Sequence, residues 1–368
     1  MRSSSAGRFD YDEVNEMESI KFLLFADLHY KKGMYIAGVA DLEAVLDRAH
    51  TSGASLVLHA GDFCNDYQHS PELIHAYLNN PHGLPVYGIY GNHELETPEN
   101  SMANVTPCLT NREVVWGTPD GKIGDGSIAY YYFDVDGFRF VCSDMNYSLN
   151  PETGEWEHNH AVSHGHPKGN LYACSLGATQ LKWIEDVLTD AAKKQKKCIF
   201  LSHGGVSEFW YASPDAAAVR EIFAKVNAMQ KGTVLMAIQG HLHTHHLAEK
   251  DGVVYFDVNT VRNTKWVKNE HATDHYDGVT YPFVDYDADG KEIARYDRPI
   301  TEVRMARNQW FNTDPLSAVV TVWKNGKIEI EGSESTWLEG FLPPAERIGE
   351  GVMPCIKSAG FAALDERD

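Results

Sequence analysis

Eight side chains that can bind metal ions or contact phosphate groups recur along this sequence in five short blocks. They are Asp27, His29, Asp62, Asn92, His93, His203, His241 and His243, in blocks that read D-x-H, GD, GNHE, H and GHxH. Each block follows or ends a short run rich in Val, Ile, Leu or Phe. A metal site needs nitrogen and oxygen donors held by rigid elements, and strand ends supply such positions. The pattern therefore indicates a single shared site.

One reaction that such donors can support is phosphoester hydrolysis. This reaction needs a nucleophile stronger than neutral water and relief of the negative charge that develops on the phosphate. Two cations about 3.5–4 Å apart meet both needs, because they lower the pKa of a water between them and hold the phosphate oxygens. The mixture of imidazole, carboxylate and amide donors suits Mn, Fe, Zn or Co better than Mg or Ca, which prefer oxygen ligands.

The first three blocks each follow an expected strand, at residues 21–25, 56–59 and 86–90. Apolar residues at helical spacing from Ile36 to Ala49 predict a helix between the first two strands. Pro71 after Ser70 is typical of the first position of a second helix. This β-α-β-α-β order favours parallel strands, with ligands at their carboxyl ends.

The later part of the chain continues with hairpins and further strand–helix units. We expect a hairpin at 130–135 and 138–143, helices at 178–194 and 214–229, strands at 198–201, 234–238 and 253–258, and a hairpin at 318–323 and 327–331. Residues 94–127 and 145–176 lack periodicity and are expected to be long irregular segments.

The five blocks together resemble the calcineurin-like metallophosphoesterase superfamily, whose pattern is D-x-H, GD, GNH[D/E], H and GHxH. All five blocks are present in order, over residues 20–260. The resemblance implies an α/β fold of mixed α+β type, a four-layer αββα sandwich with two mixed β-sheets flanked by helices. We expect an N-terminal arm at 1–19, the metallophosphoesterase core at 20–265, and a C-terminal elaboration at 266–368 that packs on the core and includes the second hairpin.

The resemblance also implies a role for each matching residue. One metal ion would be held by Asp27, His29 and His243, and the other by Asn92, His203 and His241, with Asp62 bridging the two. The cofactors would be two transition-metal ions, Mn, Fe or Zn. His93 would not bind metal; it would donate a proton toward the leaving oxygen or stabilise the phosphoryl charge.

This chain departs from the patterns of two branches of the family, which argues against a Tyr–Fe(III) site and against a dedicated protein phosphatase. The purple acid phosphatase branch has D-x-G at the first block and a Tyr three residues after the bridging Asp, where this chain has His29 and Asn65. The Ser/Thr protein phosphatase branch reads GDxVDRG, and this chain lacks its Arg and has Asn65 for its second Asp. Glu94 and Asp66 are candidates for supporting the ligands, with Asp66 orienting His93. The alternative for Asp66 is a role in a turn.

Substrate selection is expected from the segments beside the strand ends. Asn146, Tyr147 and Trp210 are candidate substrate-binding residues, since aromatic rings there could stack a base or cover an apolar leaving group. The alternative is that these rings only pack the surrounding loops. A helix start at residues 176–183 resembles that of nucleotide-type members, which favours cyclic nucleotides, nucleoside diphosphate derivatives or glycerophosphodiesters.

Other histidines have simpler interpretations. One segment is rich in histidine, with His158, His160, His164 and His166 close together. Its two alternative interpretations are a solvated loop and a third metal site. His59 lies inside an apolar strand and is expected to be a core residue.

Composition limits the partners. The net charge of −20 disfavours long nucleic acid but leaves small phosphoesters possible, because bound metals reverse the local sign. The six cysteines are widely spaced and are expected to be reduced. The sequence contains no apolar signal segment and no run long enough for a membrane span, so we expect a cytoplasmic protein without membrane contact.

Two functions are compatible with these observations. The first is a dinuclear metal-dependent phosphoesterase that hydrolyses a small phosphodiester or phosphomonoester by metal-bridged hydroxide attack. The alternative is a catalytically inactive scaffold or binding module of the same fold. Because inactive members usually lose ligands, and this chain retains all eight matching residues, the enzyme is favoured.

Overall fold

The computed structural model describes residues 18–32, 36–95, 100–150, 153–158, 175–210, 212–262, 280–287, 291–299, 310–338 and 351–367. The expected arm at 1–19 lies almost entirely outside this described part. Within it, no helix has both the length and the apolar content needed to cross a membrane.

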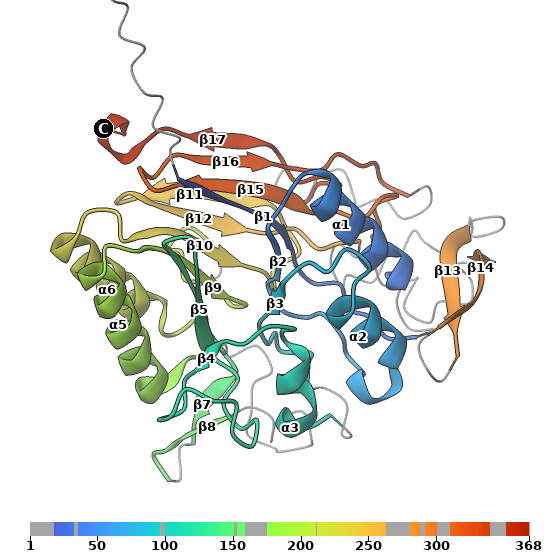
Figure 1. The fold of residues 1–368 in the computed structure, drawn as a ribbon, viewed down its shortest axis with the longest axis horizontal. Helices are drawn as coiled ribbons and strands as arrows, with labels where there is room; N and C mark the ends of the chain where they lie inside the picture. The colour runs from blue at the N-terminus through green and yellow to red at the C-terminus, as the bar shows by residue number, and fades with distance from the viewer. Residues whose placement is uncertain are drawn as a thin grey trace, which may run out of the picture.

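Two mixed sheets form the centre of the fold (Figure 1). The first sheet contains, in spatial order, β17 (Ala359–Phe361), β16 (Ile328–Glu331), β15 (Ala318–Trp323), β1 (Ser19–Phe25), β2 (Leu56–His59) and β3 (Val86–Gly88). The second sheet contains β11 (His246–Lys250), β12 (Val253–Asp257), β10 (Val234–Gln239), β9 (Lys197–Ser202), β6 (Phe138–Cys142), β5 (Tyr131–Val135) and β4 (Val115–Trp116). The strands that precede the ligand blocks are parallel within each sheet.

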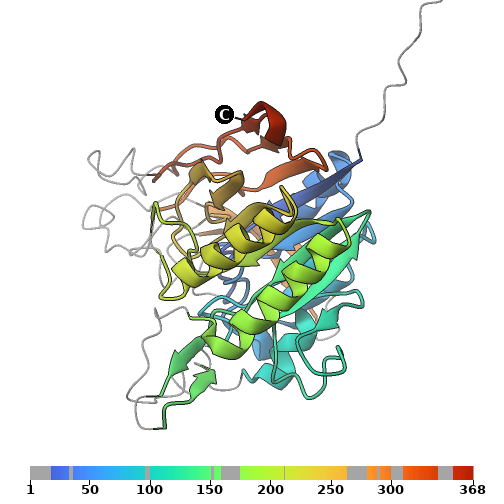
Figure 2. The ribbon, with the colours of Figure 1, turned by 90° about the vertical axis from the view of Figure 1, so that its left-hand side faces the viewer.

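Helices cover the outer face of each sheet. On one side of the molecule lie α1 (Val39–Thr51) and α2 (Pro71–Leu78), and on the other lie α5 (Gly177–Lys193) and α6 (Ala216–Met229) (Figure 1). The last two run side by side over the second sheet (Figure 2). This arrangement confirms the expected α/β fold with two mixed sheets flanked by helices.

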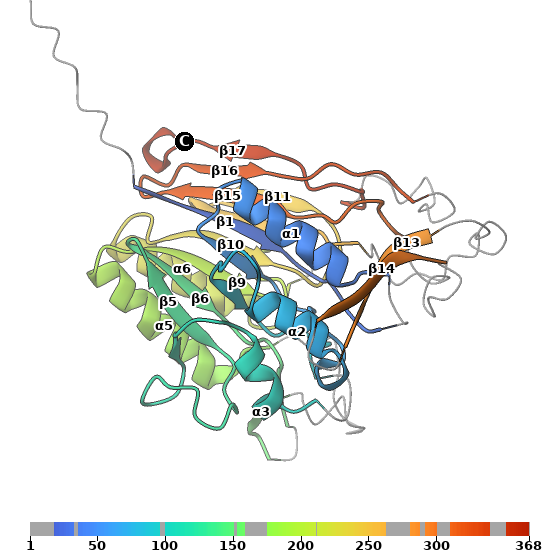
Figure 3. The same cartoon turned by 45° about the vertical axis from the view of Figure 1, so that its right-hand side comes forward.

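Smaller elements complete the described chain. They are α3 (Met102–Val105), the 3₁₀ turns at Tyr67–His69, Thr106–Cys108 and Leu364–Glu366, the ribbon β7 (Tyr147–Leu149) and β8 (Trp156–His158), and the ribbon β13 (Thr280–Tyr286) and β14 (Glu292–Pro299). The second ribbon lies beside α1, at the edge of the molecule (Figure 3).

The core between the two sheets is built from aromatic side chains. The ring of Phe22 on β1 meets the ring of Phe140 on β6 edge-on, with 5.6 Å between centroids, and Phe133 on β5 stacks on Phe140 at 4.8 Å. The hydroxyl of Tyr131 on β5 also donates to the carbonyl of Gly88 on β3 at 2.7 Å. These contacts fix the spacing of the sheets, so the loops at their edges are held against each other.

The first helix begins later than its apolar pattern predicts. Its apolar positions are buried, but α1 starts at Val39 rather than Ile36. The backbone N–H of Gly38 donates to the Asp41 carboxylate at 2.9 Å. This contact satisfies one of the unpaired N–H groups at a helix start, so it sets the boundary.

The C-terminal strands are part of the first sheet. β15 pairs antiparallel with β1 along six residues. Arg48 on α1 donates to the carbonyl oxygens of Ser317 at 2.6 Å and Glu331 at 2.9 Å. Arg48 therefore joins the C-terminal strands to the first helix.

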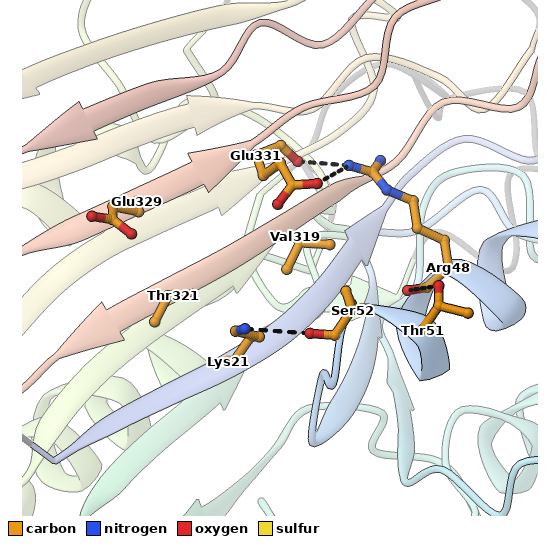
Figure 4. A pocket seen from close by; sticks show the side chains of 8 residues that line it. All are labelled: Lys21, Arg48, Thr51, Ser52, Val319, Thr321, Glu329 and Glu331. Carbon is orange, nitrogen blue, oxygen red and sulfur yellow. Dashed lines mark hydrogen bonds and ion pairs between the residues drawn. The ribbon is translucent and has the colours of Figure 1, made fainter.

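A pocket of about 360 Å³ lies beside these contacts (Figure 4). The residues that line it interact with one another; the side chain of Lys21, for example, donates to the carbonyl of Ser52 at 3.3 Å.

Several elements lacked a sequence signal. β7, β8, β13 and β14 fall in segments for which no strand was expected, and every described side chain of β14 is exposed or half-exposed. Two-stranded ribbons on a surface bury neither face completely, so no apolar alternation marks them. β11 forms an edge of the second sheet and is half-buried along its whole length, so no alternation of apolar and polar residues marks it either.

One close contact in the core leaves no room for a side chain at position 88. A Cβ added at Gly88 on β3 would lie 1.7 Å from Nε2 of His59 on β2, and both residues are buried. We expect Gly88→Ala to lower the free energy of unfolding by about 1–3 kcal/mol, as overpacked cores do. The cost should be smaller in a His59→Ala background, which makes room for the methyl group.

Urea unfolding of the four variants measures this coupling. Gly360→Ala on β17 is the matched control, because its added Cβ would meet no atom closer than 3.9 Å. A wild-type-like stability for Gly88→Ala would show that the packing is looser than described.

Candidate metal centre

The ligand blocks lie at the carboxyl ends of five parallel strands. Asp27 and His29 follow β1, Asp62 follows β2, Asn92 follows β3, His203 follows β9, and His241 and His243 follow β10. Backbone hydrogen bonds join neighbouring blocks, from Asp27 N to Gly61 O at 3.0 Å and from His29 N to Asp62 O at 2.8 Å. The first three strands belong to one sheet and the last two to the other, so the cluster exists only where the sheets meet.

One group of four donors gathers around His29. The ligand atoms of Asp27, His29, Asp62 and His243 all lie within 4.8 Å of one another, and all four residues are buried. Nε2 of His29 is 2.9 Å from Nε2 of His243 and 3.5 Å from Oδ2 of Asp62. Nε2 of His243 is 3.3 Å from Oδ1 of Asp27. Two imidazoles and two carboxylates at such distances can hold one cation.

A second group shares Asp62 with the first. Nε2 of His203 lies 3.1 Å from Oδ2 of Asp62 and 3.2 Å from Oδ1 of Asn92. Nδ1 of His241 lies 2.9 Å from the same Asn92 oxygen. Oδ2 of Asp62 therefore contacts both groups and is placed to bridge two ions. The structure thus brings together all seven residues for which a metal-ligand role was predicted.

Two of the imidazoles are oriented with Nδ1 toward a protein acceptor and Nε2 toward the cluster. Nδ1 of His203 donates to the carbonyl of Ala60 at 2.7 Å, and Nδ1 of His29 faces Oδ1 of Asn65 at 3.3 Å. With the proton on Nδ1, the lone pair lies on Nε2, the atom that faces the cluster. Together with the mixed donor set, these tautomers fit a pair of transition-metal ions.

Burial and charge oppose each other at this site. Burial lowers the pKa of His29, and lowers that of His241 to about 3. Burial also acts to lower the pKa of His203, but the Asp62 carboxylate, together with Asp27 and the carbonyl of Ala60, outweighs it and raises this pKa to about 10. Conversely, burial acts to raise the pKa of Asp62, while His203, His93 and His29 bring it well below its usual range. In the metal-free protein His203 and Asp62 therefore form a buried ion pair, in which a proton occupies the place of a cation.

Backbone strain is concentrated in the ligands. Of the eight non-glycine residues with positive φ in the described part of the chain, five are predicted ligands: Asp27 (55°), His29 (52°), Asp62 (51°), His241 (71°) and His243 (53°). The left-handed conformation costs about 1–2 kcal/mol for a residue with a Cβ. Such strain persists only where the surrounding structure imposes it, and it concentrates at functional sites.

Glycines allow the blocks to approach each other. A Cβ on Gly91 would lie 2.1 Å from Oδ1 of Asp62. A Cβ on Gly240 would lie 2.8 Å from Oδ2 of Asp27 and 2.8 Å from the carbonyl of Ala60. The GNHE and GHxH blocks thus need glycine at these two positions, because any side chain there would collide with the carboxylate of Asp62 or Asp27.

Glu94 holds the backbone of two ligand blocks in place. Its buried carboxylate accepts the backbone N–H groups of Asp62 at 3.1 Å, of Phe63 at 2.6 Å, and of Gly91. Burial, and after it the Asp62 carboxylate, raise the pKa of Glu94 to about 7. The structure therefore places Glu94 as the anchor between the GD and GNHE blocks, a position that agrees with its predicted supporting role.

The expectation for Asp66 needs correction. Its carboxylate contacts Nδ1 of His69, its neighbour in the following turn, at 2.9 Å. The residue that reaches His93 is Asn65, whose amide nitrogen lies 3.2 Å from Nδ1 of His93. Asn65 is fully buried, whereas His69 lies on the surface. The chain direction after Asp62 turns Asn65 inward and Asp66 outward, which spacing alone did not reveal.

The three candidate substrate residues have different surroundings. Asn146 is buried, and its amide donates to the carbonyl of Gly91 at 3.1 Å and to Asp144 at 2.9 Å, so it orders the loop that carries Asn92. Tyr147 is half-buried with its ring against His158, at 5.0 Å between centroids. Asn146 is thus engaged with the protein rather than directed to a substrate.

Trp210 lies beside His246, the first residue of β11, which is the strand that follows the GHxH block. It is half-buried and stacks on His246 at 4.5 Å between centroids, next to Phe209, which is 44% exposed. Its role in substrate binding stays a prediction.

The remaining histidines are partly described. His158 on β8 pairs with the buried carboxylate of Asp144 at 2.8 Å, which fixes the ribbon to the end of β6. His160, His164 and His166 lie outside the described residues, so a site at that loop stays untested. His59 is buried and stacks on Phe63 at 4.8 Å, as expected for a core residue.

Sequence reasoning missed two supporting contacts. Asn65 touches both His29 and His93. Thr260 donates from its hydroxyl to the carbonyl of Asp27 at 2.7 Å. The signal for Asn65 was its place three residues after Asp62, where one branch of the family has an Asp. Nothing in the sequence singles out Thr260.

Comparison with known proteins agrees with this geometry. The family model of the calcineurin-like phosphoesterases matches residues 20–245, so this chain belongs to that family. No curated protein matches the sequence significantly.

Among solved structures, a dimetal phosphatase from Danio rerio is similar, with a TM-score of 0.52 and 15% identity over 86% of this chain and 98% of that one. GAP50, the anchor in the inner membrane complex of Plasmodium, has a TM-score of 0.42 and 11% identity over 94% and 89%. A putative 5′-nucleotidase from Staphylococcus aureus has a TM-score of 0.40 and 13% identity over 91% and 56%. At these identities the likeness to the first structure concerns the fold.

The strain in the ligand loops predicts an unusual ranking of variants. In metal-free protein, His29→Gly should be more stable than His29→Ala by up to about 1 kcal/mol, because glycine adopts positive φ without a Cβ clash. At His203, which has no positive φ, the order should reverse, with alanine ahead by about 0.4–1 kcal/mol. Urea unfolding with EDTA measures both pairs, and the same order at both positions would contradict the strain.

The ion pair between His203 and Asp62 predicts proton release. At pH 8 metal binding should release about one proton per chain, because His203 must lose its proton before Nε2 can bind a cation. Since the raised pKa of His203 is about 10, apparent metal affinity should rise with pH up to that value. Calorimetric titration with Mn²⁺ in two buffers of different ionisation enthalpy gives the number of protons. A His203→Asn variant should show no such release, and a buffer-independent enthalpy for the wild type would refute the assignment.

Proposed function

We propose that this protein is a two-metal phosphoesterase that hydrolyses a small phosphodiester or phosphomonoester. The observation that carries the proposal is the position of Oδ2 of Asp62 between two groups of donors, each of which contains residues from both sheets. Membership of the calcineurin-like phosphoesterase family supports the same reaction class.

The donor set supports transition metals. Five imidazole or amide groups and two carboxylates favour Mn, Fe or Zn over Mg and Ca. When bound, such a pair supplies an activated water and neutralises phosphate charge. The residues of this chain hold the ions in a largely buried cluster, where electrostatic interactions are stronger than in water.

His93 is the protein group placed to act on the substrate. Its backbone N–H donates to Oδ1 of Asp62 at 2.8 Å, and its ring lies 4.9 Å from that of His29 at an angle of 80°. It is half-exposed, while most of the ligands are buried. The imidazole is therefore at the surface of the cluster, where a phosphate group would bind.

The chemistry of the surroundings supports small substrates. The net charge of −20 opposes long nucleic acid, whereas a small anion can be held by the metals. Trp210, stacked on His246 and partly exposed, offers a ring for a base or another planar group, which favours nucleotide-like substrates over glycerophosphodiesters. We further propose a cytoplasmic enzyme that acts without membrane contact.

The test is reconstitution with metal followed by turnover. Purified protein is stripped with EDTA, loaded with Mn²⁺ and analysed for metal content, and hydrolysis of bis-p-nitrophenyl phosphate and p-nitrophenyl phosphate is followed. About two ions per chain and turnover of either ester are the expected result. Two bound ions without turnover on a broad set of phosphoesters would favour the inactive scaffold instead.

A variant at His93 tests its assigned position. His93→Ala should lower kcat by about 10²–10⁴ while the metal content stays near that of the wild type, because the ring contacts substrate and not metal. His75→Ala, an exposed histidine on α2, is the matched control and should retain full activity. Loss of the metals from His93→Ala would instead assign His93 a ligand role.

A further inference from the structure

Three glycines from turns of both sheets surround one leucine. Gly232 precedes β10, Gly252 precedes β12, which is parallel to β10, and Gly326 follows β15, which is antiparallel to β1. The predicted metal ligands follow the carboxyl ends of β1 and β10, so these turns lie at the opposite edge of the sheets. The glycines have positive φ, at 66°, 75° and 89°. An added Cβ would lie 2.1 Å from the side chain of Leu364 at the first glycine, 3.2 Å at the second and 2.4 Å at the third. Leu364 therefore fills a socket that side chains at these positions would close.

A single arginine connects the two sheets at the same edge. Nη1 of Arg367 lies 3.1 Å from Oε1 of Glu249 on β11 of the second sheet, and Nη2 donates to the carbonyl of Gly326 in the turn between β15 and β16 of the first sheet. The side chain of Arg367 is 9% exposed. Charge-assisted hydrogen bonds that are shielded from water are stronger than ion pairs at the surface. Arg367 therefore holds this edge more firmly than the exposed pair of Lys231 with Asp365 does.

The segment that carries these two side chains is short. Residues Leu364–Glu366 form a 3₁₀ turn at the edge marked C in Figure 1, and the N–H of Leu364 donates to the carbonyl of Asn325 at 3.0 Å. Leu364 is half-buried at the margin of the core, and a pocket of about 590 Å³ lies beside it and Arg367. A segment with few buried contacts opens at a lower free energy than the strands of the core.

We infer that residues Leu364–Arg367 are a latch between the two sheets, which opens and closes as one unit with the turns at Gly232, Gly252 and Gly326. In the closed state, one leucine and one arginine hold a turn of the first sheet against turns of the second. In the open state, these turns lose their protection from water together, while the aromatic core and the edge that carries the predicted ligands stay closed. The latch is a conformational device because it opens without unfolding the protein.

Amide hydrogen exchange of the full-length protein measures the opening of the latch. Three backbone N–H groups report on it, those of Leu364 in the latch, Gly326 in the first sheet and Thr233 in the second, and each donates a backbone hydrogen bond of between 2.8 and 3.1 Å. The exchange rate of each group gives the equilibrium constant for its opening. We expect the three constants to agree within about threefold, because the groups open in the same event.

Removal of the leucine side chain tests whether the turns depend on the latch. In Leu364→Ala all three groups should exchange about tenfold faster, by a common factor, because the lost side chain contacts turns of both sheets. Leu149→Ala, at a 52% exposed leucine on β7, is the matched control and should leave the three rates unchanged. Faster exchange confined to the N–H of residue 364, or to the turns of one sheet, would identify a loose chain end and overturn the inference.

Urea separates opening of the latch from unfolding of the whole protein. An opening that exposes little surface responds weakly to denaturant, whereas global unfolding responds in proportion to the surface exposed. The reference is the buried N–H of Ala60, which donates to the carbonyl of Phe25 at 2.9 Å beside the predicted ligands. Below the unfolding transition, urea should accelerate exchange strongly at Ala60 and weakly at the three latch groups. The same strong dependence at all four would mean that this edge opens only when the whole protein unfolds, which contradicts a latch.

Discussion

The arrangement of this protein depends on a carboxylate buried where two sheets meet. Asp62 lies within 3.5 Å of imidazoles from both sheets, and its backbone is held by Glu94 beneath it. A buried charge needs partners of opposite sign, and in the metal-free protein the protonated ring of His203 is one such partner. Two bound cations would balance the carboxylates of Asp27 and Asp62, and their binding would then stabilise this edge of the two sheets.

The local backbone bears part of the cost of this arrangement. Five ligands adopt positive φ, and glycines stand wherever a Cβ would collide with a carboxylate. The compensation lies elsewhere in the molecule, in the aromatic core between the sheets and in the backbone hydrogen bonds that join the loops after β1 and β2. A rigid scaffold of this kind can hold strained residues in place, whereas an isolated loop would relax.

Residues beside the predicted ligands hold the site and the loops around it in place. The buried side chain of Asn65 contacts the rings of both His29 and His93. The ribbon of β7 and β8 is fixed near the site by the pair of His158 with buried Asp144, while Trp210 stands beside the strand after the GHxH block. These features lie outside the predicted ligand set, and loops around a rigid scaffold are where enzymes commonly carry their binding residues.

The sequence by itself determined the ligand blocks, their order and the strands that precede them, because buried parallel strands appear as continuous apolar runs and metal-ligating residue types are few. It also predicted the start of α2 at Pro71, and it predicted α5 and the hairpin of β15 and β16 close to their observed bounds. Only the tertiary structure decided that Asn65 and not Asp66 meets His93, that Asn146 serves the loop of Asn92, and that β15 joins β1. Side-chain direction in a loop and the pairing of distant strands depend on contacts between residues far apart in the chain. No local pattern records such contacts.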